Sequence, residues 1–358
     1  MKWRDRRLLD LFGIEHPIVQ APMAGLSTPQ MAIAASEAGG LGSIAAAMLS
    51  PETLRSELQL MQQATGRPIN VNFFVHNPPT ADPAREAAWR RRLEGYYREL
   101  GLSLEDAAGG PARAPFSAAM CDVVLEYKPK VVSFHFGMPD ADLVKRLKDV
   151  GTIVISSATT VEEARWLEAN GCDAVIAQGN EAGGHRGIFL SDDIARQPGT
   201  MALVPQVVDA VKVPVIAAGG IGDGRGIAAA LALGAAGVQV GTAFLLAPEA
   251  RTTTLHRKAL AEARDDSTTL TNIFTGRPAR SIVNRYVREV GPMNPDAPAF
   301  PLAAGLSGPL RSASEAKGSS DFMPLWSGQA PTFAREMPTG ALVSTLVKET
   351  SEVLQRMA

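Results

Sequence analysis

The stretch VPVIAAGGIGDGRGIAAALALGAAGVQVGT, residues 213–242, decides the fold. Two short apolar runs, Val213–Gly220 and Gly237–Thr242, lie on either side of a helical segment at Asp223–Leu233. Continuous apolar runs rich in β-branched residues are typical of parallel strands that are buried on both faces. The stretch therefore predicts two parallel strands joined by a helix.

The same pattern recurs upstream of this stretch. Six further candidate strands are Pro17–Ala21, Leu41–Ala46, Ile69–Phe74, Lys130–His135, Thr152–Ser157 and Asp173–Gln178. Helical segments are expected at Thr28–Ala38, Ser50–Ala64, Pro139–Asp149 and Thr160–Asn170. Eight strands with helical crossovers favour an α/β fold of the (β/α)8 TIM-barrel class over a doubly wound sheet. A count of six strands would have left the fold open.

Residues typical of helix ends support these boundaries. Ser50 is followed by Pro51, the order expected at a capped helix start, and Gly171 and Gly234 follow the ends of two helices. The tail from Pro338 is predicted to form an amphipathic last helix. Its apolar side would carry Leu342, Leu346, Val353 and Met357.

Two segments interrupt the strand–helix period. An insertion at 77–121, after the third strand, holds a charged helical piece at Arg85–Leu100 and a Gly/Pro/Ala-rich piece at Ala107–Pro115. The residues after 247 are too many for one closing helix, and their Pro/Gly-rich centre is typical of ordered loops. The predicted organisation is a barrel at 1–247, a smaller helical and irregular subdomain over the barrel mouth at 248–320, and a C-terminal segment at 321–358 whose helix returns to the barrel.

The composition excludes several classes of protein. Of 358 residues, 46% are hydrophobic and 20% charged, with a net charge of -2, so nothing indicates a nucleic-acid or anionic membrane partner. The two cysteines, Cys121 and Cys172, form no metal or disulfide pattern. Neither a signal peptide nor an apolar run of membrane-spanning length is present. We expect a soluble, cytoplasmic protein, either a monomer or a homodimer.

The seventh and eighth strand ends indicate a phosphate site. Active sites of TIM barrels lie at the carboxyl ends of the strands, and the loops after strands seven and eight often bind phosphate. In this chain the two strand ends are rich in glycine, which lets the backbone approach a ligand, and Thr242 adds a hydroxyl group. The residues concerned are Gly219, Gly220, Gly222, Gly237, Gly241 and Thr242. The alternative is that these glycines only form tight turns.

The sixth strand ends in QGNEAGGHRG, residues 178–187, the candidate catalytic segment. Four glycines around His185 are typical of a loop that presents a side chain rather than a packed element. Histidine can act as a base at neutral pH. His135, at the end of the fourth strand, could face the same cavity or be a satisfied, partly buried histidine. His16, His76 and His256 are interpreted as structural or surface residues, and no metal site is predicted.

At these residues the chain resembles a family, the nitronate monooxygenases, and is similar to their class I branch. The matching pieces are QAPMAGLSTPQMAIAASEAGGLGSIAA, SFHFGMP, SSATTVEEARWLEANGCDAVIAQGNEAGGHRGIF, VPVIAAGGIGDGRGIAAALALGAAGVQVGTAFLLAPEA, FTGRPARSIVNR and LWSGQ. The resemblance runs from Pro17 to the last helix, and QGNEAGGHRG is its most specific motif.

The resemblance implies a bound FMN at the barrel mouth. Pro22 and Met23 would line its ring system, Asn72 and Gln178 would hydrogen-bond it, and Gly183 and Gly184 would lie against it. The phosphate would be held by Gly219, Gly220, Gln239, Val240, Gly241 and Thr242. Asn70 competes with Asn72 for its role. His185 would be the active-site base, with His135 as a second polar group near the substrate.

The implied reaction is oxidation of an alkyl nitronate by O2 to a carbonyl compound and nitrite. The class I branch suggests propionate 3-nitronate as the substrate and detoxification as the role. Phe300 stands where we expect relatives to carry a tyrosine, which puts substrate preference in doubt. Two other functions stay open. They are an FMN-dependent NAD(P)H:quinone reductase or enoyl-ACP reductase of the same superfamily, and a flavin-free barrel lyase or isomerase acting on a phosphorylated substrate.

Overall fold

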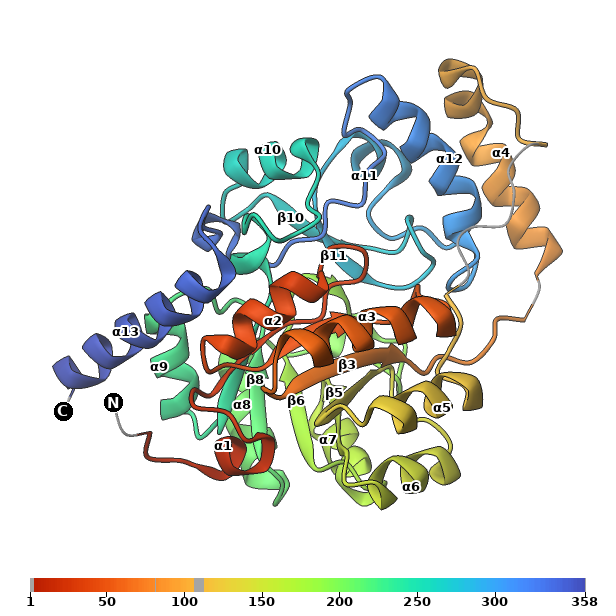
Figure 1. Cartoon of the computed structure of the whole chain (residues 1–358). Coiled ribbons are helices and arrows are strands. Elements are labelled where there is room, and N and C mark those ends of the chain that lie inside the picture. The colour runs from red at the N-terminus through yellow and green to blue at the C-terminus, as the bar shows by residue number, and fades with distance from the viewer. Residues whose placement is uncertain (1–2, 81, 106–112, 358) are drawn as a thin grey trace.

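Eight parallel strands form a closed barrel in the computed structural model, which describes residues 3–80, 82–105 and 113–357 (Figure 1). The strands are β1 (Ile18–Gln20), β2 (Gly42–Ala45), β3 (Ile69–Phe74), β4 (Val131–His135), β5 (Ile153–Ala158), β6 (Ala174–Gln178), β8 (Val215–Ala218) and β9 (Gly237–Val240). Their order is β1-β9-β8-β6-β5-β4-β3-β2, and a parallel bridge between Val19 and Leu41 joins the two ends. The predicted (β/α)8 fold is confirmed, with seven strands inside their predicted ranges and β5 extending one residue beyond its range, to Ala158.

A ring of helices covers the barrel. These are α2 (Pro29–Glu37), α3 (Pro51–Ala64), α5 (Ala118–Tyr127), α6 (Ala141–Asp149), α7 (Val161–Ala169), α8 (Thr200–Ala210), α9 (Gly224–Ala232) and α13 (Thr339–Met357). Side-chain caps begin several of them; Thr28 and Ser50, for example, accept hydrogen bonds from backbone N–H groups of the first turn. Helix α13 packs against both α9 and α2. The eighth helix of the ring therefore comes from the far end of the chain.

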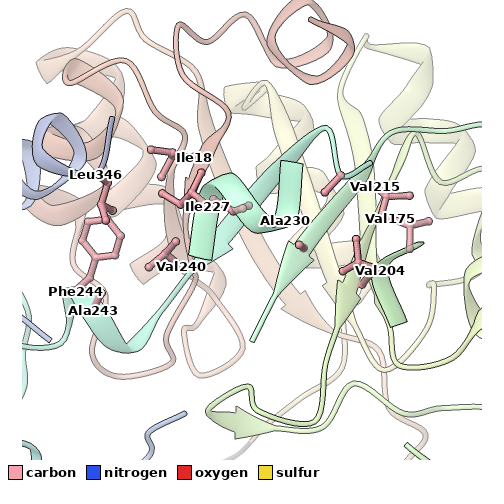
Figure 2. Packing of buried hydrophobic residues seen from close by; sticks show 14 of the residues in the cluster. Ile18, Val175, Val204, Val215, Ile227, Ala230, Val240, Ala243, Phe244 and Leu346 are labelled. Atoms are coloured by element: carbon pink, nitrogen blue, oxygen red, sulfur yellow. The ribbon is translucent and has the colours of Figure 1, made fainter. Parts of the chain in front are cut away.

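Two apolar layers hold this architecture. Inside the barrel, Val131, Ile155 and Ile216 pack at the bottom, where the short helix α1 (Arg7–Phe12) adds further apolar side chains. Outside it, strand residues pack against the helices, as Figure 2 shows for Ile18 and Ile227. Burial of this much apolar surface is the main stabilising term in such a fold.

The last helix departs from the predicted pattern at its end. Leu342 and Leu346 are buried as expected for the apolar side, and Val353 is half-buried. Met357 was placed on the same side, but it is 71% exposed. The reason is length, because α13 continues past the helices that cover its first turns (Figure 1).

The insertion and the segment after β9 share a second core. The insertion forms α4 (Pro83–Leu100), while the later segment forms α10 (Thr254–Glu262), β10 (Thr268–Thr271), β11 (Ala279–Ile282), α11 (Arg285–Val290) and α12 (Ala303–Ala316). Trp89, Leu93 and Tyr97 of α4 pack with Tyr286 and Leu310, and the Tyr97 hydroxyl donates to a backbone carbonyl of α12 at 2.7 Å. Most of the predicted Gly/Pro/Ala-rich piece, residues 106–112, lies outside the described residues.

Three short strands in this region were not predicted. Strand β11 pairs antiparallel with β10 and with β7 (Gly184–His185), a two-residue strand inside the segment that was expected to be an unpacked loop. The sequences of the three strands, GH, TTLT and ARSI, contain no continuous apolar run, which is the pattern that predicted the barrel strands. The division of the chain into three domains stays a prediction. No helix in the described ranges combines the length and apolarity needed to cross a membrane.

One glycine of β2 sets how closely a helix approaches the barrel. A Cβ atom at Gly42 would lie 1.8 Å from the Ala32 carbonyl oxygen of α2, whereas one at Gly66 would meet nothing within 4 Å. We expect Gly42→Ala to destabilise the fold by about 3 kcal/mol, because the helix must shift, and Gly66→Ala to change stability by less than about 0.5 kcal/mol. Equal unfolding free energies in urea titrations would contradict this packing.

Candidate active site

A cavity of about 300 Å³ lies at the carboxyl ends of the barrel strands. It is lined by all but one of the residues that the family resemblance assigns to catalysis or to FMN, whereas Gly222 and Gly237 of the glycine-rich strand ends are not among its lining. The assigned residues in the lining are Pro22, Met23, Asn72, His135, Gln178, Gly183, Gly184, His185, Gly219, Gly220, Gln239, Gly241 and Thr242. Because they come from six strand ends, barrel closure brings together residues up to 220 positions apart in the chain.

The exception is Val240. Its side chain is fully buried in the hydrophobic layer between the barrel and its helices, where Figure 2 shows it with Ile227. Side chains of a strand alternate between the two faces, so Gln239 faces the cavity and Val240 faces away from it. Val240 is thus left with only its backbone to offer a ligand.

The two asparagines of β3 differ in depth. Both lie on the same face of the strand, since they are two positions apart. Asn70 is fully buried and donates to Ser43 Oγ at 3.0 Å, whereas Asn72 reaches the cavity and donates to Ser133 Oγ at 3.0 Å. The structure therefore brings Asn72, not Asn70, to the cavity wall, with its amide oxygen available.

The backbone of the His185 segment is fastened from both sides. The carbonyl of His185 accepts hydrogen bonds from Gln178 Nε2 at 3.0 Å and from His135 Nε2 at 3.1 Å. Gln178 Oε1 also accepts from the backbone N–H of Gly187 at 2.7 Å. On the other side, His185 pairs with Ala279 of β11. Gln178 thus holds the segment as well as lining the cavity.

Buried charged groups complete this fastening. The Arg186 guanidinium is fully buried and donates to the carbonyls of Gln178 and Gly179, and to Gln197 Oε1 at 2.7 Å. Glu163, 1% exposed, accepts from the backbone N–H of Phe189 at 2.6 Å. Removing either partner of such a network leaves buried polar groups unsatisfied, so the segment is held in one conformation.

The imidazole of His185 is neutral in this setting. Burial, followed by the nearby Arg113 and His135, lowers the pKa of His185 well below its ordinary value. The Thr275 hydroxyl contacts His185 Nε2 at 3.0 Å and donates to the Arg277 carbonyl at 3.4 Å. The contact with Thr275 engages Nε2, whereas Nδ1 has no hydrogen-bond partner among the described residues.

His135 is also neutral but is fully engaged. Burial lowers the pKa of His135 to about 4. Its Nε2 donates to the His185 carbonyl, so Nδ1 accepts from the Ser157 hydroxyl at 3.1 Å. With both nitrogens occupied, His135 positions the backbone of His185, and a direct role toward substrate stays a prediction.

The glycine loops leave room for a ligand. Gly219 and Gly220 have φ of +115° and +69°, a region that other residues rarely adopt. A Cβ atom on Gly183 would lie 2.5 Å from the backbone N of Gly328, so the chain passes close to the cavity there. The Thr242 hydroxyl accepts from Gly328 N–H at 2.9 Å.

No functional role was predicted from the sequence for Thr275 or for several residues that line the cavity, among them Arg113, His256, Trp326 and Gly328. Thr275, which holds His185, lies in FTGRPAR, and Trp326 and Gly328 lie in LWSGQ, so both family-like segments carried a usable signal. Trp326 lies 5.5 Å from the His185 ring, centroid to centroid. Arg113, which also lines the cavity, carried none, because it stands in the Gly/Pro/Ala-rich insertion.

The charged groups of the cavity are all cationic. Among the described residues, its lining includes Arg113, Arg251 and Arg311 but neither aspartate nor glutamate. The described part of the chain also holds no cluster of three His, Cys, Asp or Glu side chains that could bind a metal ion. The cavity therefore suits an anionic ligand.

Solved structures with this fold define the class of protein. A nitroalkane oxidase from Streptomyces ansochromogenes is 43% identical, with a TM-score of 0.89 over 98% of this chain and 100% of that one. FabK from Thermotoga maritima is 30% identical, with a TM-score of 0.73 over 99% of both chains. The protein is thus an oxidoreductase built on a TIM barrel.

Sequence relatives define the family. The family model described as nitronate monooxygenase matches residues 5–349. The nitronate monooxygenase of Pseudomonas aeruginosa is 44% identical over 96% of this chain and 98% of its own length. That of Paraburkholderia phytofirmans is 41% identical over 98% and 97%. The chain belongs to the nitronate monooxygenase family, as its sequence motifs predicted.

Buried histidines should make the fold acid-sensitive. Burial lowers the pKa of His76, His135 and His256 to about 4 each, against about 6.5 in an unfolded chain. As the pH falls from about 6.5 to 4, only the unfolded chain gains these protons, so stability is lost across that window. We expect the melting temperature to be level from pH 8 to 7 and to fall steeply below 6.5.

The variant His256→Gln removes one of these groups while keeping a donor toward the Trp326 carbonyl, which His256 Nε2 contacts at 3.2 Å. Its decline in stability between pH 6.5 and 4 should be smaller by up to about 3 kcal/mol. Denaturant titrations at several pH values measure this difference. An unchanged pH dependence in the variant would show that His256 is not held neutral by the fold.

Proposed function

We propose that this enzyme binds FMN in the cavity and uses O2 to oxidise alkyl nitronates to a carbonyl compound and nitrite. The observation that carries the proposal is the cavity itself, where a neutral His185 lies among cationic side chains and no carboxylate of the described residues belongs to the lining. Such a cavity attracts both a phosphorylated cofactor and an anionic substrate. Family membership supports nitronate oxidation as the reaction.

The residues at the barrel mouth fit FMN. Gly219, Gly220 and Gly241 leave the backbone accessible where loops of this fold often hold phosphate, and Thr242 adds a hydroxyl. The Oε1 atom of Gln239 is buried and has no hydrogen-bond partner among the described residues. An unsatisfied acceptor in a cavity wall is what an N–H group of a bound ring system would satisfy. When bound, FMN supplies the electron acceptor that no side chain here provides.

The side chains bind, orient and deprotonate. Cationic groups lower the free energy of an anionic nitronate in the cavity. A preformed nitronate has already lost its α-proton, so His185 acts as a base only for neutral nitroalkanes, taking that proton on Nδ1. The aromatic rings of Phe74 and Trp326, at 5.9 and 5.5 Å from the His185 ring, exclude water from the proton's path.

The substrate that we propose is propionate 3-nitronate, a toxic metabolite, and the role is detoxification in the cytoplasm. Phe300, 7% exposed, lies 5.4 Å from the His185 ring and replaces an expected tyrosine with an apolar face. Substrate preference beside this ring must therefore come from other side chains.

A glycine variant tests FMN binding separately from folding. A Cβ atom at Gly241 would meet only Ala21 Cβ at 3.5 Å and Met23 Sδ at 4.0 Å, so the protein tolerates it while the methyl group enters the cavity. We expect Gly241→Ala to keep wild-type stability and to weaken FMN binding at least about tenfold, roughly 1.4 kcal/mol. Flavin fluorescence titration measures the affinity. Gly308→Ala, whose Cβ meets nothing within 4 Å, is the control.

Oxygen uptake and nitrite release test the reaction. We expect wild-type enzyme to consume O2 with propionate 3-nitronate. His185→Asn should retain FMN but lose neutral nitroalkane turnover by roughly 100-fold or more, because its proton acceptor is gone. Preformed nitronate should be affected much less. Unchanged turnover of a neutral nitroalkane would remove His185 from this role.

An anaerobic experiment separates the reductases that the sequence left open. Rapid bleaching of bound flavin by NAD(P)H, without bleaching by nitronate, would favour a quinone or enoyl-ACP reductase. A purified protein that binds no flavin would favour the barrel lyase or isomerase instead. Reduction by nitronate alone is the result that we expect.

A further inference from the structure

Arg113 is a buried cation that lacks a counter-charge. Its Nη1 atom is buried without a hydrogen-bond partner, and no carboxylate among the described residues lies within ion-pair distance of it. The side chain nevertheless lines the cavity. Burial, followed by the charge of Arg311, lowers the pKa of Arg113, as expected for a cation that no anion compensates.

The other two arginines that line the cavity are paired or exposed. Arg311 is paired with Glu315 at 3.0 Å, and Arg251 is exposed to water. The fully buried Arg186 donates to three oxygens, and Arg280 donates to the Asn180 carbonyl at 3.0 Å. Arg113 differs in being turned toward the cavity with donors to spare.

Arg113 and His185 both lie beside the ring of Phe300. The Arg113 guanidinium carbon lies 6.0 Å from the Phe300 ring centre, and the His185 ring lies 5.4 Å from the same centre. Phe300 in turn packs on Phe74, at 6.1 Å, so it cannot move aside freely. The Arg113 guanidinium and the His185 ring therefore lie beside the same ring in one cavity, where a ligand that contacts His185 can reach toward Arg113.

We propose that Arg113 is a specificity-determining residue that binds a carboxylate at the end of the substrate remote from the nitronate. A guanidinium matches a carboxylate with two parallel hydrogen bonds, and a bound anion would satisfy a donor that the fold leaves unpaired. The preferred substrates are then alkyl nitronates with a terminal carboxylate. This inference rests on the proposed function. It assigns a binding partner to the carboxylate of a substrate whose nitronate group reacts.

Two three-carbon substrates test the assignment, because they differ only in the carboxylate. The nitronate of 3-nitropropionate carries two negative charges, and that of 1-nitropropane carries one. Relative to wild type, Arg113→Gln should lower kcat/KM for the first by roughly 10- to 100-fold, the range expected for losing a charge-assisted hydrogen bond. For the second, the change should stay under about threefold. Arg113→Lys should recover part of the loss, since it keeps the charge but not the paired donors.

The control is Arg91→Gln, an exposed position on α4 that changes net charge equally but lies outside the cavity lining. It should leave both substrates unchanged. An equal fall for both substrates in Arg113→Gln would overturn the assignment, because it would indicate a structural role. If Arg113→Gln does not fold, competitive inhibition of the wild-type enzyme tests the assignment instead. Propionate should compete with 1-nitropropane nitronate far better than propionamide does, and equal inhibition by the two would overturn the proposal.

The two proposals fail in different ways. Wild-type enzyme that oxidises neither nitronate would refute the proposed function. Wild-type enzyme that oxidises both with equal kcat/KM would refute only the role of Arg113.

Discussion

The His185 carbonyl, held by N–H groups of Gln178 and His135, is the contact on which the site depends. It joins the ends of two barrel strands to the segment that carries the candidate base, and β11 fixes the same segment from outside the barrel. Because the His135 Nε2–H group donates to this carbonyl, its Nδ1 atom accepts a hydrogen bond from the Ser157 hydroxyl. The polar side chains at the barrel mouth thus form one connected hydrogen-bond network. Burying Arg186 beneath it extends that network to Gly179, next to the glycine loops. Catalytic geometry in such a design comes from backbone hydrogen bonds, not from a flexible loop.

Local rules predicted the barrel and much of the cavity. Buried parallel strands are continuous apolar runs, helix caps are marked by residues such as Ser50, and strand ends of a barrel share one face, so His185 could be placed before any coordinates. Asn72 came from the family resemblance, with Asn70 as an open alternative. Strand alternation also implied that Gln239 and Val240 face opposite sides, although both were assigned to the ligand. The depth of Asn70 depends on the stagger of neighbouring strands, which no local pattern contains.

Long-range contacts account for what the sequence did not predict. The core shared by Trp89 of the insertion and Tyr286 of the later segment joins residues almost two hundred positions apart. Arg113 lies in a stretch without periodicity, and the role proposed for it depends on the aromatic rings and charges that the fold brings beside it. The electrostatic character of the cavity follows in the same way. The charge of the cavity depends on which arginines are paired with a carboxylate in the folded chain. The net charge of the whole chain, -2, does not predict it.

The position of α13 in the helix ring has a consequence for biosynthesis. Leu342 and Leu346 cover apolar side chains of the barrel and of the helices beside β1 and β9, yet they emerge from the ribosome about a hundred residues after β9. During that interval, some 5–20 seconds at a synthesis rate of roughly 5–20 residues per second, a nascent barrel would expose these apolar side chains to solvent. The intervening segment shares its core with the insertion, which is synthesised much earlier, so the chain between β3 and α13 is linked by two separate cores.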